Sequence, residues 1–229
     1  MRITEYVYSG HDGEFAEFTN IGNAPLDLNG WSFDDDRGVS GTIALGAIGI
    51  VKAGESVLLT DASEADFRTA CNLCSAIRIV GHESAGLGRV DEINLSDGNF
   101  IPIDGLAFNN QAAGGGPRTQ YAGAWVSSAG LGMHTASDWT QSTLGDSEDL
   151  VASTQTGVAT PERSTQATIS FDPCAGSTGA PIVSVDRTAT SLYLDLAEIG
   201  SGALSGVIDD PTDPAASTGI GFTFALPGG

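Results

Sequence analysis

The feature that most constrains the fold is a series of short segments in which polar and apolar residues alternate. Gly, Asn and Pro residues separate these segments within the first hundred positions. Successive side chains of a β-strand point to opposite faces, so the pattern predicts consecutive strands with one face buried. The 31 glycines and 9 prolines favour a turn-rich all-β chain. The segments are residues 2–8, 13–20, 26–33, 54–60 and 91–98.

Within these segments, particular side chains predict packing and turns. Trp31 and Phe33 alternate with Ser32, so both rings are expected to face inward from one side of a strand. Residues 52–55 are expected to connect two strands in a hairpin. The pair of strands around residues 96–99 has the strongest hairpin signal in the chain, because Asp-Gly favours tight turns.

One short helix is expected after residue 60. Asp61 and Glu64 have the spacing of a capping box, with Asp61 as the N-cap residue. Residues 65–70 follow, with Phe67 as the side chain that anchors the helix to the core.

Charge excludes several classes of partner. The chain has 9 basic and 29 acidic residues, a formal net charge of −20. Nucleic-acid binding depends on cationic side chains that displace counterions, so we expect no binding to nucleic acid or to an anionic membrane. The acidity is compatible with divalent cations, with a saline environment, or simply with the solubility of an extracellular protein. No apolar run approaches the roughly 18 residues of a membrane span.

Three cysteines offer either a disulfide or a metal site. Cys71 and Cys74 form a C-x-x-C pair, and Cys174 lies far downstream. The pair follows the expected helix, where the negative end of the helix dipole disfavours a thiolate, which argues against redox catalysis. A structural zinc site needs four ligands, and His82 is the only nearby candidate for the fourth. We favour a disulfide between two of the three cysteines; their spacing leaves the pairing open.

Carboxylate clusters suggest calcium as a candidate cofactor, and no other cofactor is expected. Hard oxygen ligands of this kind suit Ca²⁺, but neither cluster has the spacing of an EF-hand loop. The alternative is that these aspartates are solvated turn residues, which we favour. The clusters are Asp34, Asp35 and Asp36, and Asp209, Asp210 and Asp213.

Catalytic motifs are absent from the sequence. His11, His82 and His134 are the only histidines, and none lies in a recognisable catalytic motif. Trp125 and Trp139 lie in irregular segments and are candidates for a sugar-binding platform. We therefore expect no enzymatic activity from this segment.

The strand series resembles the lamin-tail domain, an immunoglobulin-like β-sandwich of nuclear lamins and of many secreted bacterial proteins. Residues 118–120, Trp139 and residues 142–145 match the part that wraps back over the sandwich. The resemblance covers roughly residues 2–170 and implies an all-β immunoglobulin-like sandwich with one short helix. We expect this domain over residues 1–170, a linker over 171–181, and the start of a second β-unit over 182–229.

The resemblance implies a non-catalytic binding or spacer module of an exported bacterial protein, with a protein or glycan partner. Extracellular or cell-surface location is expected, with a leader upstream and further domains in a longer chain. Two alternatives remain. One is an accessory domain of an extracellular nuclease or phosphatase, and the other is a carbohydrate-binding module.

Overall fold

The strands pair through backbone hydrogen bonds into two main sheets, and their alternating side chains bury one face of each, as the sequence predicts. The computed structural model describes residues 1–10, 13–35, 40–82, 86–146, 148, 151–152, 158–161 and 164–174. The chain divides into a first unit, Met1–Ala180, and a second, Pro181–Gly229. The second β-unit predicted over residues 182–229 lies outside the described residues, as does the predicted linker from residue 175 onward.

The first sheet has six strands, and the second has four. All pairs within them are antiparallel except the parallel pair of β7 and β8. The first sheet has the order β12 (Thr140–Gln141), β11 (Ala124–Trp125), β1 (Arg2–Val7), β2 (Phe15–Thr19), β7 (Ser56–Thr60) and β8 (Arg78–Val80). The second has the order β10 (Pro102–Asn109), β9 (Val90–Ser96), β4 (Ser32–Asp34) and β5 (Ile43–Ala44).

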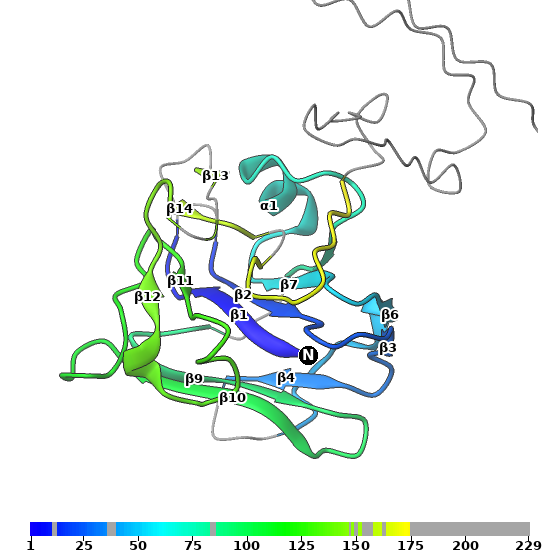
Figure 1. Cartoon of the computed structure of the whole chain (residues 1–229), viewed down its shortest axis with the longest axis horizontal. Helices are drawn as coiled ribbons and strands as arrows, with labels where there is room; N and C mark the ends of the chain where they lie inside the picture. The colour runs from blue at the N-terminus through cyan, green and yellow to red at the C-terminus, as the bar shows by residue number, and fades with distance from the viewer. Residues whose placement is uncertain are drawn as a thin grey trace, which may run out of the picture. The chain divides into compact units, whose positions relative to one another are not determined.

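Aromatic and aliphatic side chains from both sheets form the main core between them. Figure 1 shows the strands of the second sheet running beneath β1 and β2. Phe18 of β2 meets Phe33 of β4 edge-on at 5.9 Å between ring centroids, and Tyr6 of β1 lies 4.7 Å from Phe108 of β10. Trp31 belongs to the same core, so the predicted inward direction of Trp31 and Phe33 is confirmed. This architecture is an immunoglobulin-like all-β sandwich.

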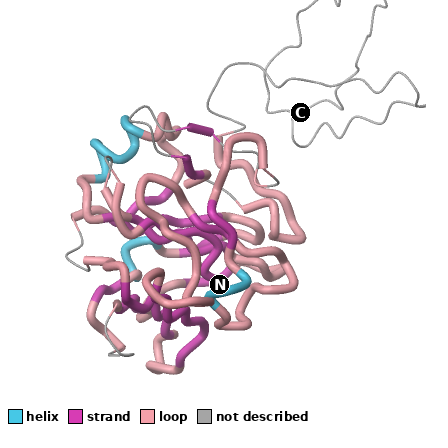
Figure 2. Tube along the Cα trace, turned by 90° about the vertical axis from the view of Figure 1, so that its left-hand side faces the viewer, coloured by secondary structure: helices cyan, strands magenta, loops and turns pink. Residues whose placement is uncertain are grey.

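Several short strands and 3₁₀ turns lie outside the two main sheets. Loops and turns surround the strands, as Figure 2 shows. Two further pairs are small antiparallel ribbons of two residues per strand. These elements are β3 (Leu26–Asp27) with β6 (Ile50–Val51), β13 (Val151–Ala152) with β14 (Val158–Ala159), and the 3₁₀ turns η1 (Gly46–Ile48) and η2 (Ala136–Asp138).

The predicted hairpin signals have different outcomes. Strands β9 and β10 pair across the turn at residues 97–101, so that hairpin is confirmed. The hairpin across residues 52–55 is wrong, because β6 pairs with β3 while β7 pairs with β2 and β8. The turn itself forms, with the Glu55 N–H donating to Lys52 O, but it carries the chain from one sheet to another.

The helix α1 (Glu64–Ala70) begins two residues later than the capping box predicts. Its N-cap is Ser63, whose Oγ accepts the Asp66 N–H at 3.0 Å, so the assignment of Asp61 as N-cap is wrong. Asp61 instead accepts the Glu14 N–H at 2.9 Å. Phe67 anchors the helix as predicted: it packs edge-on against Phe15 on the face of the first sheet that points away from the main core.

A segment near residue 170 returns over the turn that leads into β7. The Lys52 ammonium lies 5.1 Å from the centroid of the Phe171 ring. The Gln166 side chain accepts the Ser128 N–H at 2.7 Å, which fixes the segment at its other end. Among the described residues, no helix is long and apolar enough to cross a membrane.

Candidate functional site

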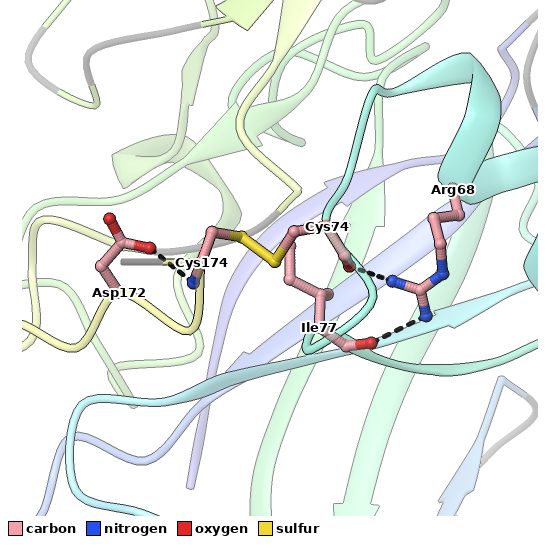
Figure 3. The surroundings of a disulfide bond; sticks show 5 residues. All are labelled: Arg68, Cys74, Ile77, Asp172 and Cys174. Atoms are coloured by element: carbon pink, nitrogen blue, oxygen red, sulfur yellow. Dashed lines mark hydrogen bonds between the residues drawn. A yellow bond between two sulfur atoms is a disulfide. The ribbon is translucent and has the colours of Figure 1, made fainter. Parts of the chain in front are cut away.

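A disulfide joins Cys74 to Cys174, with Cα atoms 5.8 Å apart (Figure 3). Cys71 lies outside this bridge, at the C-terminal end of α1. All three cysteines contact the apolar cluster under the helix. A zinc site built from three thiolates is incompatible with this pairing, because bridged sulfurs are no longer thiolate ligands.

Hydrogen bonds hold both ends of the bridge. The Arg68 guanidinium donates to the carbonyl oxygens of Cys74 and Ile77, which fixes the turn after α1. On the other side, the Asp172 carboxylate accepts the Cys174 N–H at 2.8 Å. The bridge therefore joins two segments that are each ordered by local polar contacts.

The predicted calcium ligands do not form one cluster in the described residues. Asp34 is the last residue of β4 and is buried, so its assignment to an exposed turn is wrong. Its Oδ1 accepts from the Asn94 side chain at 3.2 Å. Asp35 is half-buried beside it, whereas Asp36, Asp209, Asp210 and Asp213 lie outside the described residues. Within the described part of the chain, no three or more His, Cys, Asp or Glu residues are arranged to hold a metal ion.

The two candidate sugar-binding tryptophans have other roles. Trp139 is only 8% exposed and packs edge-on against Tyr6, with 5.3 Å between ring centroids. Its prediction as a surface platform is wrong, because its side chain belongs to the main core. Trp125 is half-buried on β11, and its Nε1–H donates to Asp146 at 3.1 Å.

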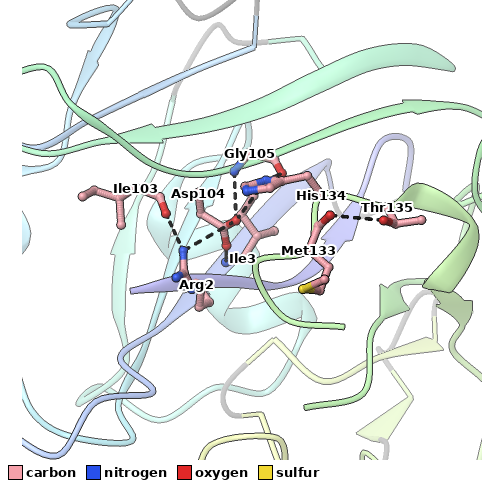
Figure 4. A network of polar contacts seen from close by, with 8 residues as sticks. All are labelled: Arg2, Ile3, Ile103, Asp104, Gly105, Met133, His134 and Thr135. Atoms are coloured by element: carbon pink, nitrogen blue, oxygen red, sulfur yellow. Dashed lines mark hydrogen bonds and ion pairs between the residues drawn. The ribbon is translucent and has the colours of Figure 1, made fainter. Parts of the chain in front are cut away.

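A polar network around Asp104 of β10 was not predicted from the sequence (Figure 4). Asp104 is buried and accepts the N–H groups of Ile3 and Gly105, both at 2.9 Å. Arg2 and His134 approach its Oδ1 at 3.9 Å and 3.5 Å. The network connects β10 to β1 at one edge of the sandwich. No local motif marks it, because its members lie about 30 and 100 residues apart.

Two buried glutamates on the first sheet were also missed. Glu5 of β1 and Glu17 of β2 are directly opposite each other in the strand register. Only 4% of Glu5 and 1% of Glu17 is exposed. Burial raises the pKa of Glu17 to about 8, and it raises the pKa of Glu5 well above its usual range. A signal was present in the sequence, since Glu17 sits between apolar residues in a segment with imperfect alternation.

Among the hollows of the described surface, two are lined partly by charged side chains. The larger, of about 260 Å³, lies beside β8 and is lined by Ile48, Glu64 and residues 75–80. The smaller holds only about 10 Å³ beside Glu14, whose pKa burial raises to about 7. Neither hollow contains Glu5 or Glu17, so the most strongly perturbed carboxyl groups are away from both.

Comparison with protein families finds a similarity in the N-terminal part of the chain. Residues 1–110 match the family model described as Lamin Tail Domain. No curated protein and no solved structure gives a significant match. The matched range contains β1 to β10, whereas β11, β12 and the bridged Cys174 lie beyond it.

Proposed function

We propose that this chain is a non-catalytic binding or spacer module of an exported bacterial protein, because residues 1–110 match the lamin tail domain family. The domain family is immunoglobulin-like and non-catalytic. The proposal extends that property to this chain and adds an extracellular or cell-surface location.

The Cys74–Cys174 bridge carries the location part of the proposal. Disulfides persist in oxidising surroundings and are rare where cellular thiol systems keep cysteines reduced. The bridge ties the segment before residue 175 to the apolar cluster under α1, so it stabilises this side of the domain. The net charge of −20 supports an extracellular location, because strong like charge limits the association of dissolved proteins.

The burial of Glu5 and Glu17 supports a non-catalytic role for these two carboxyl groups. General acid–base catalysis needs a carboxyl group within hydrogen-bond reach of a substrate. Glu5 and Glu17 lie under covering residues of the same chain, as their exposures of 4% and 1% indicate. The half-exposed His134 contacts Asp104, but that carboxylate is occupied by two backbone N–H groups and serves the junction of β1 with β10.

A secretion and turnover experiment tests the proposal. The full chain is produced behind a bacterial secretory leader, and peptide mapping without reduction should find Cys74 linked to Cys174 in the exported protein. The purified protein is then incubated with DNA and with phosphate esters, each with Ca²⁺ or Mg²⁺. We expect no turnover above a buffer blank. Turnover that persists through repurification would instead support a hydrolase, and export of a fully reduced protein would remove the argument for location.

A further inference from the structure

Two halves of the outer face of the first sheet differ in chemistry. Val7, Phe15 and Leu58 form an apolar half, which α1 covers. The other half is polar and is formed by Glu5 and Glu17, together with hydroxyl residues of β1, β2 and β7. Later residues of the chain cover this polar half. We call Ser142, Glu148, Thr160, Thr165 and Gln166 the cover.

Neutral groups supply the contacts to the two carboxyl groups. Glu5 accepts the Thr160 N–H at 2.9 Å and the Ser142 hydroxyl at 3.2 Å, so it attaches the cover directly to β1. Glu17 accepts the Thr4 hydroxyl at 2.6 Å through Oε1. Its Oε2 is buried and has no hydrogen-bond partner in the described part of the chain. The backbone of Gly123 packs directly on Glu5, since a Cβ there would lie 2.1 Å from Oε1.

No cation balances the pair within the described residues. The ion pairs found there involve other carboxylates, namely Glu55, Glu64 and Asp104. The charged groups that act on the pair are Glu17, which raises the pKa of Glu5, and Glu148, which is buried in the cover and raises the pKa of both. Glu148 is itself held by the Thr165 N–H and hydroxyl and by the Gln166 side chain. Strand β7 contributes Ser56, and Gly123 lies just before β11; both residues are uncharged.

Burial without a neighbouring cation favours the protonated form of Glu5 and Glu17. An unpaired ionised carboxylate is costly to bury, and two facing each other without a cation are costlier still. We propose that Glu5 and Glu17 form a proton-binding site that holds the cover on the sheet at neutral pH and loosens it as the pH rises. A retained proton also makes the Glu17 side chain neutral, so its buried Oε2, which has no hydrogen-bond partner in the described part of the chain, carries no charge. When both glutamates are ionised, a second negative charge lies beneath Glu148. The neutral donors Ser142 and Thr160 are then the groups that still hold the cover on Glu5.

The direction of the pH effect follows from linkage. Burial raises the pKa of Glu17 from 4.5 to about 8, and that of Glu5 is also raised, first by burial and then by Glu17. A carboxyl group that binds its proton more tightly when folded contributes stability below its unfolded pKa. That stability is lost as the pH rises toward the folded pKa. The site is therefore most stable below about pH 4.5 and loosens progressively as the pH rises toward 8.

Two measurements on the full, oxidised chain test this proposal. The first follows the side-chain carboxyl ¹³C shifts of glutamate from pH 3 to pH 10. Glu17, assigned by its absence in Glu17→Gln, should titrate near pH 8. The second follows hydrogen exchange of the Thr160 amide, corrected for intrinsic rates. Between about pH 5 and 8, its opening constant should rise up to about tenfold per pH unit for each proton lost.

The variants separate the proposed site from a general effect of pH. In Glu17→Gln, the pH dependence of Thr160 opening should fall to that of one proton, because the amide imitates the protonated carboxyl of Glu17 while Glu5 still titrates. Glu64→Gln, at a mostly exposed helix position, should leave it unchanged. Titration of both buried glutamates near pH 4.5 would overturn the proposal. So would a Ca²⁺-dependent gain in melting temperature that Glu17→Gln abolishes, because the pair would then bind a cation. If Glu17→Gln fails to fold, the wild-type titration still decides, with assignment through backbone-linked spectra.

Discussion

Cys74 and Cys174 are bonded across a sequence separation of 100 residues, so one covalent link spans more than half of the first unit. The bridge joins the turn after α1 to the segment that packs over the β7 turn. All strands from β8 to β14 lie in the closed loop. Because the cover of the polar half also lies in this loop, the bridge restrains the residues that bury Glu5 and Glu17.

Removing the bridge should reduce stability substantially. Closing a loop of this length reduces the entropy of the unfolded chain, an effect of about 4–5 kcal/mol in the chain-entropy model. We expect Cys174→Ser to lower the free energy of unfolding by about 2–5 kcal/mol, since measured losses are commonly below the model value. Urea unfolding of the full chain under oxidising conditions measures this change.

Cys71→Ser is the matched control for the bridge. It changes the neighbouring sulfur but leaves the bond between Cys74 and Cys174 intact. Its unfolding midpoint should stay close to the wild-type value and far above that of Cys174→Ser. Equal losses in the two variants would mean that cysteine packing, rather than the covalent link, stabilises this region.

Gly54 tests how closely the returning segment packs on the β7 turn. Its φ is +78°, and a Cβ there would lie 2.1 Å from the Ile169 carbonyl oxygen. Gly54→Ala should therefore cost about 2–4 kcal/mol, from an unfavourable backbone conformation and from overpacking. The free energy of urea unfolding gives the value.

Gly114→Ala separates these two costs. Gly114 has a similar φ of +76°, but no atom lies within 4 Å of a Cβ built on it. It should lose only about 1 kcal/mol, the cost of the backbone conformation alone. If Gly54→Ala and Gly114→Ala are equally stable, the segment around Ile169 does not contact the turn in solution.

Local alternation predicted much of the sandwich, but it did not predict which strands pair. The inward rings of Trp31 and Phe33 follow from a period of two residues, which is a local property. The partner of β6 is β3, about 24 positions earlier, and that choice depends on how both sheets close around the core. A turn such as residues 52–55 has the same local signal whether it joins paired strands or connects two sheets.

The buried glutamates show why part of the candidate site escaped sequence analysis. A glutamate in an alternating strand is normally expected on the solvent face. Glu5 and Glu17 do lie on the outer face, but the cover lies over it. Ser142 and Thr160 of the cover contact Glu5 across 137 and 155 positions of sequence. Nor could spacing select Cys174 as the partner of Cys74, because three cysteines allow three pairings.

Glu14 should produce a second pH dependence, separate from that of the buried pair. Burial raises its pKa to about 7, and the Leu87 N–H partly opposes this by donating to Oε1 at 2.9 Å. The folded-state pKa exceeds the unfolded value of 4.5, so the stabilising contribution is complete below pH 4.5 and is lost as the pH rises through 7. Glu14→Gln removes this titration.

The difference between wild type and Glu14→Gln isolates the effect. Urea unfolding is measured for both proteins from pH 4 to pH 9. The stability of wild type relative to the variant should fall between about pH 4.5 and pH 7 and then level off. Glu64→Gln should give a difference that is flat over this range. A wild-type advantage that grows with pH would contradict the raised pKa, because it would require Glu14 to be stabilised as the charged form.

Trp139 should be a stability residue rather than a sugar-binding residue. Its side chain is 8% exposed and fills the space beside Tyr6, so Trp139→Ala leaves a cavity in the main core. Large-to-small substitutions of this kind cost about 3–5 kcal/mol. Trp125→Phe keeps an aromatic ring and loses only the hydrogen bond to Asp146, so it should cost about 1 kcal/mol. Guanidinium unfolding measures both losses, and glycan-array binding is recorded for each folded variant. If Trp139→Ala unfolds at the wild-type midpoint, the core role is contradicted. If this equally stable variant also loses glycan binding, the carbohydrate-binding alternative is restored.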